Sequence, residues 1–179
     1  AEVAREFRDA IGPLVANDML AGVLAQFPWS FRNTAANRDY LVEIVQRTPD
    51  VDWFVEFRHR GWIVPVVGDL LRENGIGYVS VDEPDLPGLV PPVAKATTPV
   101  AYIRLHGRNS DAWWGGGASR YDYLYTREEL EPWARKIVNL AGSVREAYVF
   151  FNNCHDSKAP ANAAMMRELI MSLPGAAVV

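Results

Sequence analysis

The residues best suited to chemistry lie at the end of one apolar run, VAYIRLHGR at 100–108. Arg104, His106 and Arg108 alternate there, so on a strand all three side chains project to the same side while the strand lasts. Guanidinium groups suit phosphate or carboxylate, and an imidazole can act as acid, base or ligand. We therefore predict ligand-binding arginines and a catalytic histidine. In the structural alternative, Arg104 pairs with Glu56 and His106 bonds a loop carbonyl.

Two carboxylates, Glu56 and Asp82, stand at the ends of other apolar runs. Carboxylates in such positions can carry out general acid–base catalysis or bind a metal ion. Unpaired buried charges are costly, so Arg58 and Arg104 are expected to offset both carboxylates in one network, which could also be purely structural. A divalent metal held by Glu56, Asp82 and His106 is a weaker alternative. The guanidinium groups would repel it, and no zinc-type spacing occurs.

The loop after the fourth run carries Trp113 and Trp114, followed by three glycines. We predict a lid whose indoles stack on a sugar or base, with the glycines as a hinge. The alternative is that both indoles pack on neighbouring loops, as is expected for Trp29. The glycines do not form a P-loop, because no Gly-Lys-Ser/Thr follows. Further ligand contacts are predicted for Arg120, Tyr121, Tyr123, Asn152, Asn153 and Lys158.

Strand and helix patterns alternate along the chain and would position these residues. The apolar runs predict five strands, at 22–28, 53–58, 77–84, 100–108 and 146–153. Such an alternation is typical of a parallel sheet covered by helices. Each run also has one face that turns polar toward its C-terminal end, which favours a TIM-barrel-like (β/α) barrel over an open sheet. In the third run this pattern assigns Tyr78, Ser80 and Asp82 to the barrel mouth.

Local signals mark the helix boundaries. Gly12-Pro13 is expected to end the N-terminal helix, and Asn33 or Thr34 can cap the second one. The segment Thr126–Glu129 has the pattern of a capping box and predicts the start of a later helix.

The composition limits the class of protein. A chain of 179 residues, 49% hydrophobic and 22% charged, is expected to form one domain over 1–179. Its net charge of −4 gives no global attraction to nucleic acid or anionic membranes. The single cysteine, Cys154, cannot form an internal disulfide. Neither a signal peptide nor a membrane-spanning apolar stretch is recognisable, so a cytoplasmic location is expected.

Several segments resemble one known family. AQFPWSF, VEFRH, VDEP, YIRLHGR, RYDYLYTREELEPWA, YVFFNN and KAPANA are similar, in order from about residue 22 to 170, to segments of the domain of unknown function 72 family, the YecE-like proteins. The resemblance implies a TIM-barrel-like fold and brings no settled activity. Family members have further βα units before the QFP strand. We therefore expect a partial barrel of about five βα units, which a missing segment or an oligomer would complete.

The strand ends together suggest a function. We predict an enzyme-like site that binds a small anionic or hydroxylated ligand, such as a phosphorylated sugar or a nucleotide, at the C-terminal ends of the strands. A hydrolase or an isomerase would fit, but the residues specify no reaction. One alternative is a metal-dependent phosphoesterase or isomerase-type barrel. The other is a non-enzymatic module that binds nucleic acid or protein, which the acidic net charge disfavours.

Overall fold

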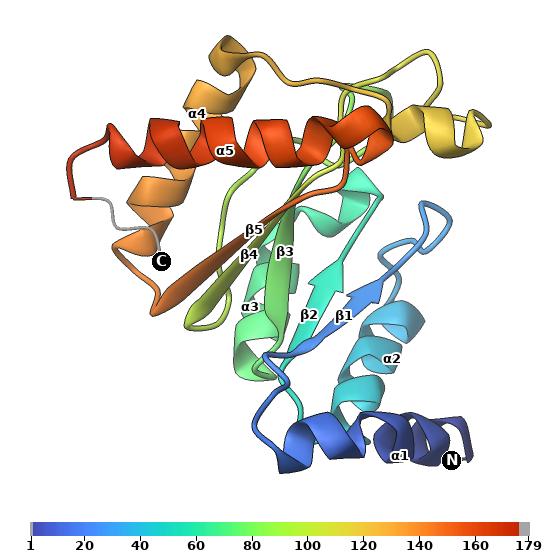
Figure 1. Cartoon of the computed structure of the whole chain (residues 1–179). Coiled ribbons are helices and arrows are strands. Elements are labelled where there is room, and N and C mark those ends of the chain that lie inside the picture. The colour runs from blue at the N-terminus through green and yellow to red at the C-terminus, as the bar shows by residue number, and fades with distance from the viewer. Residues whose placement is uncertain (1, 176–179) are drawn as a thin grey trace.

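The computed structural model describes residues 2–175 as an α/β fold around one parallel sheet (Figure 1). The five strands are β1 (Val23–Gln26), β2 (Trp53–Glu56), β3 (Gly77–Asp82), β4 (Val100–Leu105) and β5 (Glu146–Phe151). They pair in sequential order, and every pair is parallel. The predicted α/β class with five parallel strands is confirmed. In the described chain β1 and β5 are the sheet edges, so the sheet is an open arc that fits a partial barrel.

Five α-helices and three short 3-10 helices accompany the sheet. They are α1 (Glu2–Ala16), α2 (Ala35–Gln46), α3 (Pro65–Glu73), α4 (Arg127–Ala141), α5 (Lys158–Met171), η1 (Arg60–Trp62), η2 (Gly117–Tyr121) and η3 (His155–Ser157). Thr34 caps α2 by accepting a hydrogen bond from the Asn37 backbone N–H at 3.2 Å. The capping box of Thr126 and Glu129 starts α4 as predicted, because each side chain accepts from the other residue's backbone N–H.

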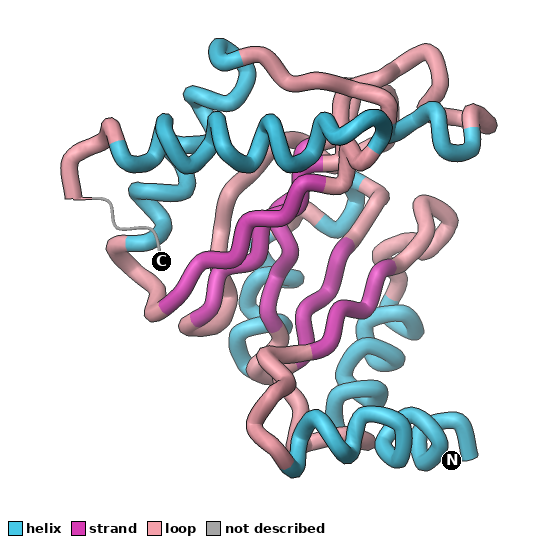
Figure 2. The backbone as a smooth tube through the Cα atoms, viewed as in Figure 1, coloured by secondary structure: helices cyan, strands magenta, loops and turns pink. Residues whose placement is uncertain are grey.

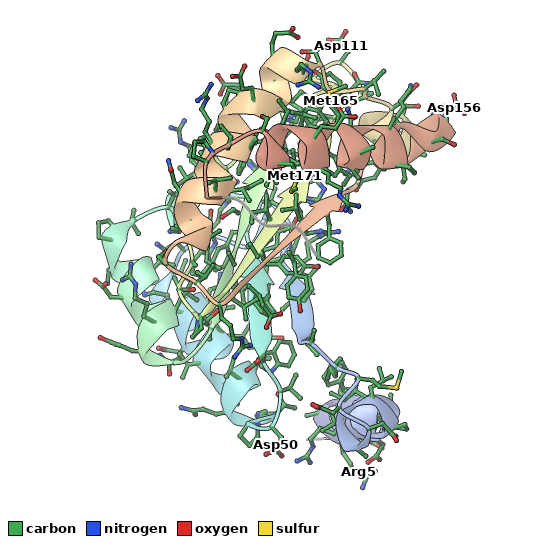
Figure 3. The ribbon with its side chains drawn as sticks, turned by 60° about the vertical axis from the view of Figure 1, so that its left-hand side comes forward. Arg5, Asp50, Asp111, Asp156, Met165 and Met171 are labelled. Carbon is green, nitrogen blue, oxygen red and sulfur yellow. The ribbon has the colours of Figure 1, made fainter. Side chains whose placement is uncertain are left out.

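The first helix continues through Gly12 and Pro13, so the prediction that they end it is wrong. Proline removes one helical hydrogen bond, but no residue of α1 is buried, so water can satisfy the freed carbonyl. The helix ends instead near Asn17, whose Nδ2 donates to the Pro13 carbonyl at 2.7 Å, and Asp18 follows with a φ of 54°. Figures 1 and 3 show α1 beyond the end at which the strands begin.

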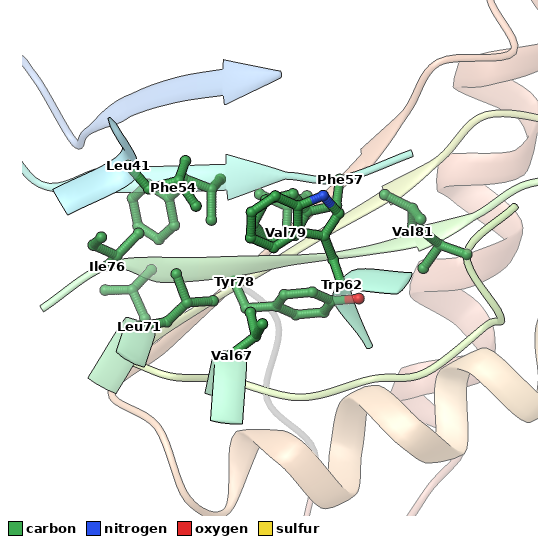
Figure 4. Close-up of a cluster of buried hydrophobic side chains, with 13 residues drawn as sticks. Leu41, Phe54, Phe57, Trp62, Val67, Leu71, Ile76, Tyr78, Val79 and Val81 are labelled. Atoms are coloured by element: carbon green, nitrogen blue, oxygen red, sulfur yellow. The ribbon is translucent and has the colours of Figure 1, made fainter. Parts of the chain in front are cut away.

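Two buried apolar clusters hold the sheet to its helices. In the first, shown in Figure 4, Tyr78 packs with Val67 and Leu71 of α3. Trp62 stacks there on Phe57, with ring centroids 4.2 Å apart. The second cluster joins β4 to α4 and α5 through Ala101, Ile103, Leu105, Leu130, Trp133, Ile137, Met166 and Leu169. The partly buried Ala147, Val149 and Phe151 of β5 pack against it. We call this side of the sheet the helix-facing side and the opposite side the inner face.

Strand register decides which side chains share the inner face. Val55 pairs with Tyr78, so Tyr78 lies on the helix-facing side, and Val81 pairs with Arg104 on the inner face. The assignment of Tyr78, Ser80 and Asp82 to the barrel mouth is therefore wrong, because the third strand is turned the other way. All five strands run into their C-terminal loops at the same end of the sheet (Figure 2).

Candidate functional site

Glu56 is the centre of a buried polar cluster on the inner face, at the C-terminal end of β2. Arg104 Nη1 donates to its Oε2 at 2.5 Å. Arg58 Nη2 lies 2.6 Å from its Oε1, and His106 Nε2 lies 3.1 Å from the same oxygen. These four residues come together as the sequence predicted. The network also contains the predicted Arg104–Glu56 ion pair. Its geometry fits both a structural ion-pair network and a ligand-binding site.

The environment sets opposite charge states for Glu56 and His106. Burial would raise the pKa of Glu56, but the hydrogen bond from His106 and the charges of Arg58 and Arg104 lower it to about 2. Burial lowers the pKa of His106 to about 4, and the nearby arginines add to this while Glu56 opposes it. At neutral pH the cluster therefore holds an ionised Glu56 and a neutral His106. The Nδ1 atom of His106 is buried and has no partner within residues 2–175.

Glu83 belongs to the same cluster, although the sequence analysis did not select it. Its Oε2 accepts a hydrogen bond from Arg58 Nη1 at 3.1 Å, and its Oε1 accepts one from the Val90 backbone N–H at 2.9 Å. Burial raises the pKa of Glu83 to about 7, against the opposing effect of Arg58. Strand alternation places Glu83 on the same face as Val81, two positions earlier, but only the pairing of Val81 with Arg104 shows that this face is the inner one.

Gln26, at the end of β1, is the second residue that the sequence analysis missed. Its exposed side-chain carbonyl accepts hydrogen bonds from Arg104 Nη1 at 3.0 Å and from Arg58 Nη2 at 3.3 Å. Two guanidinium groups thus converge on one neutral oxygen at the surface of the cluster. Gln26 pairs in register with Glu56, which places both side chains on the same face.

Asp82 lies apart from this cluster, so the prediction that it shares a network with Glu56 is wrong. It is buried on the helix-facing side, where Arg108 binds it with two hydrogen bonds of 2.7 and 2.8 Å. The Tyr125 hydroxyl and the Trp133 indole N–H also donate to it, at 2.6 and 2.7 Å. Arg108 likewise leaves the side shared by Arg104 and His106, because β4 ends at Leu105 and Gly107 turns the chain with a φ of +91°.

The loop after β4 reaches the mouth of the cluster. Trp113 is 3% exposed, and its ring centroid lies 5.9 Å from the Arg58 guanidinium carbon. Trp114 is 55% exposed. The ring of Tyr121 lies 6.5 Å from that of His106, and Arg120 lies over Tyr121 at 5.8 Å. Trp113 and Tyr121 therefore border the inner-face cluster, whereas Trp114 and Arg120 contact other loop residues.

The remaining predicted contacts tie loops together. The Tyr123 hydroxyl donates to Glu129 at 2.5 Å, and burial together with that carboxylate raises its pKa to about 12. Asn153 is buried, and its Nδ2 donates to the Tyr123 carbonyl at 2.8 Å. Lys158, at the start of α5, pairs with Asp122. The backbone N–H of Asn152 donates to the Leu105 carbonyl at 2.7 Å, extending the pairing of β4 and β5.

The proposed metal ligands are not assembled as a set. Glu56 and His106 meet on the inner face, while Asp82 lies on the other side of the sheet. Among residues 2–175 no group of three or more His, Cys, Asp or Glu side chains is placed to hold a metal ion. Arg58 forms ion pairs with both Glu56 and Glu83, so its positive charge occupies the place where a metal cation would bind these two carboxylates.

Comparison with known proteins identifies the family. The family described as "Protein of unknown function DUF72" matches residues 1–176. The chain belongs to the DUF72 family. The UPF0759 protein YunF of Bacillus subtilis (strain 168) is 32% identical to it over 181 residues, covering 94% of this chain and 64% of the relative.

Two crystal structures of DUF72 family proteins share the fold. TM1631 from Thermotoga maritima is 41% identical with a TM-score of 0.90, and the match covers 95% of this chain and 65% of that one. EF0366 from Enterococcus faecalis is 28% identical with a TM-score of 0.88, over 95% of this chain and 66% of that one. The chain thus spans about two thirds of the length of these DUF72 relatives. No helix in residues 2–175 is long and apolar enough to cross a membrane.

Proposed function

We propose that this chain carries an enzyme-like site that binds a small anionic or hydroxylated ligand, such as a phosphorylated sugar or a nucleotide, at the C-terminal ends of its strands. The observation that carries the proposal is the convergence of Arg58 and Arg104 on the exposed carbonyl oxygen of Gln26. Guanidinium groups bind anionic oxygens with shorter and stronger hydrogen bonds than neutral ones. An oxygen of a phosphate or carboxylate would therefore replace the Gln26 oxygen favourably.

The charge balance of the cluster leaves room for an anion. Two guanidinium groups face one firmly ionised carboxylate, Glu56, and a second carboxyl, Glu83, whose pKa of about 7 leaves it partly protonated at neutral pH. His106 is neutral there. A bound anion would be attracted to the guanidinium groups and would favour the protonated form of Glu83.

The same charge states suggest separate roles for the acid–base groups. Glu56 is too weakly basic, with a pKa of about 2, to accept a proton readily, so we assign it to holding Arg58 and Arg104. Glu83 has a pKa close to neutral pH, as a general acid or base requires. His106 presents an unpartnered Nδ1, which accepts from a ligand hydroxyl in the tautomer whose Nε2–H faces Glu56, and donates to one in the tautomer whose Nε2 accepts from Arg58 Nη2 at 3.1 Å.

Substitutions at Gln26 and Arg104 test the proposal by isothermal titration calorimetry with ribose 5-phosphate and inorganic phosphate. Gln26→Glu places a carboxylate where the anion would bind, so it should abolish binding while leaving the exposed position folded. Arg104→Ala should weaken binding about 10- to 100-fold, the value of a hydrogen bond to a charged group. The control Arg127→Ala removes one exposed charge from α4 and should leave binding unchanged. Equal affinities for Gln26→Glu and the unmodified protein would contradict the proposal.

We also infer that further strands cover the inner face, supplied by another segment or by a second chain. Tyr102 lies 5.0 Å from Phe150 in ring centroids, and Phe150 is 44% exposed at the edge strand β5. Exposed apolar side chains beside an open sheet edge favour association. If a second chain is the cover, light scattering of the 179-residue chain should detect an assembly larger than one chain that Phe150→Asp reduces. A monomer at all concentrations would exclude the second chain as the cover.

A further inference from the structure

Three loops at the C-terminal end of the sheet bring aromatic rings together. Trp29 follows β1, His59 follows β2 and Trp114 lies in the loop after β4. Trp29 lies 5.7 Å from Trp114 and 5.5 Å from His59 in ring centroids, with edge-to-face geometry in both pairs. Trp29 packs on neighbouring loops, as expected, and it is 36% exposed beside Trp114. We call Trp29 and Trp114 the indole corner.

Indole N–H groups distinguish the tryptophans at the mouth from those of the interior. Trp53, Trp62 and Trp133 each donate to a protein oxygen, at 2.8, 2.7 and 2.7 Å. Trp29, Trp113 and Trp114 donate their indole N–H groups to no residue within 2–175. Buried tryptophans normally satisfy this donor, and an open donor is typical of a ring that faces water or a ligand. The three mouth indoles therefore keep donors available.

The indole corner is held in place and carries positive charge. The guanidinium carbon of Arg32 lies 3.6 Å from the Trp29 ring centroid, in cation–π geometry. Gly88 has a φ of +87°, which is strained for other residues, and a Cβ there would lie 3.1 Å from Trp29 Nε1, so glycine favours this close approach. Burial and the charges of Arg32 and Arg60 lower the pKa of His59, which leaves it neutral between two cations. The platform is thus preorganised and attracts anions.

We propose that the indole corner is a stacking subsite for the base of a nucleoside monophosphate whose phosphate binds Arg58 and Arg104. The proposal rests on the proposed function and specifies its ligand class. The two indole planes meet at 73°. A planar ring stacked on the more exposed Trp114 is therefore edge-on to Trp29, one face of which Arg32 already covers, and both arrangements are favourable between aromatic rings. A sugar ring has no π system and gains neither aromatic contact.

The indole corner adjoins the proposed anion site through the chain itself. Trp113 is next to Trp114 and lies within cation–π range of Arg58. Trp29 follows Gln26 by three positions, and Gln26 is the residue on which both guanidinium groups converge. A ligand with its phosphate on the guanidinium pair would have to extend past Trp113 to place its base on the indole corner.

Calorimetric titration with three probes tests the inference: adenosine 5′-monophosphate, ribose 5-phosphate and inorganic phosphate. The nucleotide should bind about 5- to 100-fold more tightly than ribose 5-phosphate, which corresponds to stacking of one base on an aromatic side chain. Trp114→Ala should remove this advantage without changing the affinity for ribose 5-phosphate. Trp114→Phe, which keeps a stacking ring, should retain most of it. Because Trp114 is exposed, both variants should keep the thermal stability of the unmodified protein.

The outcomes separate this inference from the proposed function. If ribose 5-phosphate and phosphate bind in an Arg104-dependent way but the nucleotide binds no better, the stacking subsite is wrong and the anion site stands. If Trp114→Ala weakens all three probes equally, the indole positions the loop and does not stack on a base, which also refutes the subsite. If none of the probes binds, both proposals fail.

Discussion

Glu83 and His106 should make opposing contributions to the pH dependence of stability, which single substitutions would separate. Burial raises the pKa of Glu83 from 4.5 to about 7, although Arg58 opposes this. Burial lowers the pKa of His106 from 6.5 to about 4, although Glu56 opposes that. Each pKa is thus displaced by about 2.5 (7 against 4.5, and 4 against 6.5), which is worth about 3.5 kcal/mol at about 1.4 kcal/mol per pKa unit.

The direction of each effect follows from which state holds the proton more tightly. The folded protein binds the Glu83 proton more tightly than the unfolded chain does, so this contribution is fully present below pH 4.5 and is lost as the pH rises through about 7. The folded protein disfavours protonated His106, so this contribution is fully present above pH 6.5 and is lost as the pH falls through about 4. Between about pH 4.5 and 6.5 one contribution falls as the other grows, so their sum changes little in the unmodified protein.

Urea denaturation between about pH 4.5 and 7.5 would measure the contributions of Glu83 and His106, each as the difference in free energy of unfolding between a variant and the unmodified protein. Glu83→Gln should become more stable relative to it by up to about 3 kcal/mol as the pH rises. His106→Gln, which can still donate to Glu56, should gain a similar amount as the pH falls. The double variant should give a curve parallel to that of the unmodified protein, because it lacks both terms. A difference for Glu83→Gln that stays constant over this range would refute the argument that burial raises its pKa.

Two further predictions concern the structure around the site. Asp82→Asn should lower the free energy of unfolding by about 3–5 kcal/mol in urea denaturation. The reason is that it removes the negative charge to which several buried donors, including Trp133, donate hydrogen bonds. A loss below about 1 kcal/mol would show that the network does not depend on this charge. Gly77→Ala should cost about 1–3 kcal/mol, because its Cβ would lie 2.3 Å from a ring atom of Phe54. The control Gly12→Ala, in an exposed helix with nothing within 4 Å of the new Cβ, should instead stabilise by about 0.5–1 kcal/mol, and thermal unfolding would compare the two.

Much of the fold could be predicted from the sequence because its signals are local. The capping box of Thr126 and Glu129 needs only residues three apart, and Thr34 caps its helix in the same way. The five strands were placed by runs of apolar residues, and each predicted run extends past the strand into the loop that follows. The polar residues at those ends were therefore found, although several lie beyond the last paired residue. The prediction that Gly12-Pro13 ends the first helix was wrong, because α1 is exposed and water can replace the hydrogen bond that Pro13 removes.

The sequence by itself determined the order of elements, the parallel α/β class and the gathering of Glu56, Arg58, Arg104 and His106 at one end of the sheet. Alternation along a strand states which side chains share a face, but it does not state which face is inward. Only pairing with the neighbouring strands turned Asp82 toward Trp133, 51 positions away, and Glu83 toward Arg58. Gln26 and Trp29 acquired their positions in the same way, from partners brought close by the packing of separate strands and loops. The kinds of residue at each strand end could thus be read from the local sequence. Which of these residues share one site depended on contacts between distant parts of the chain.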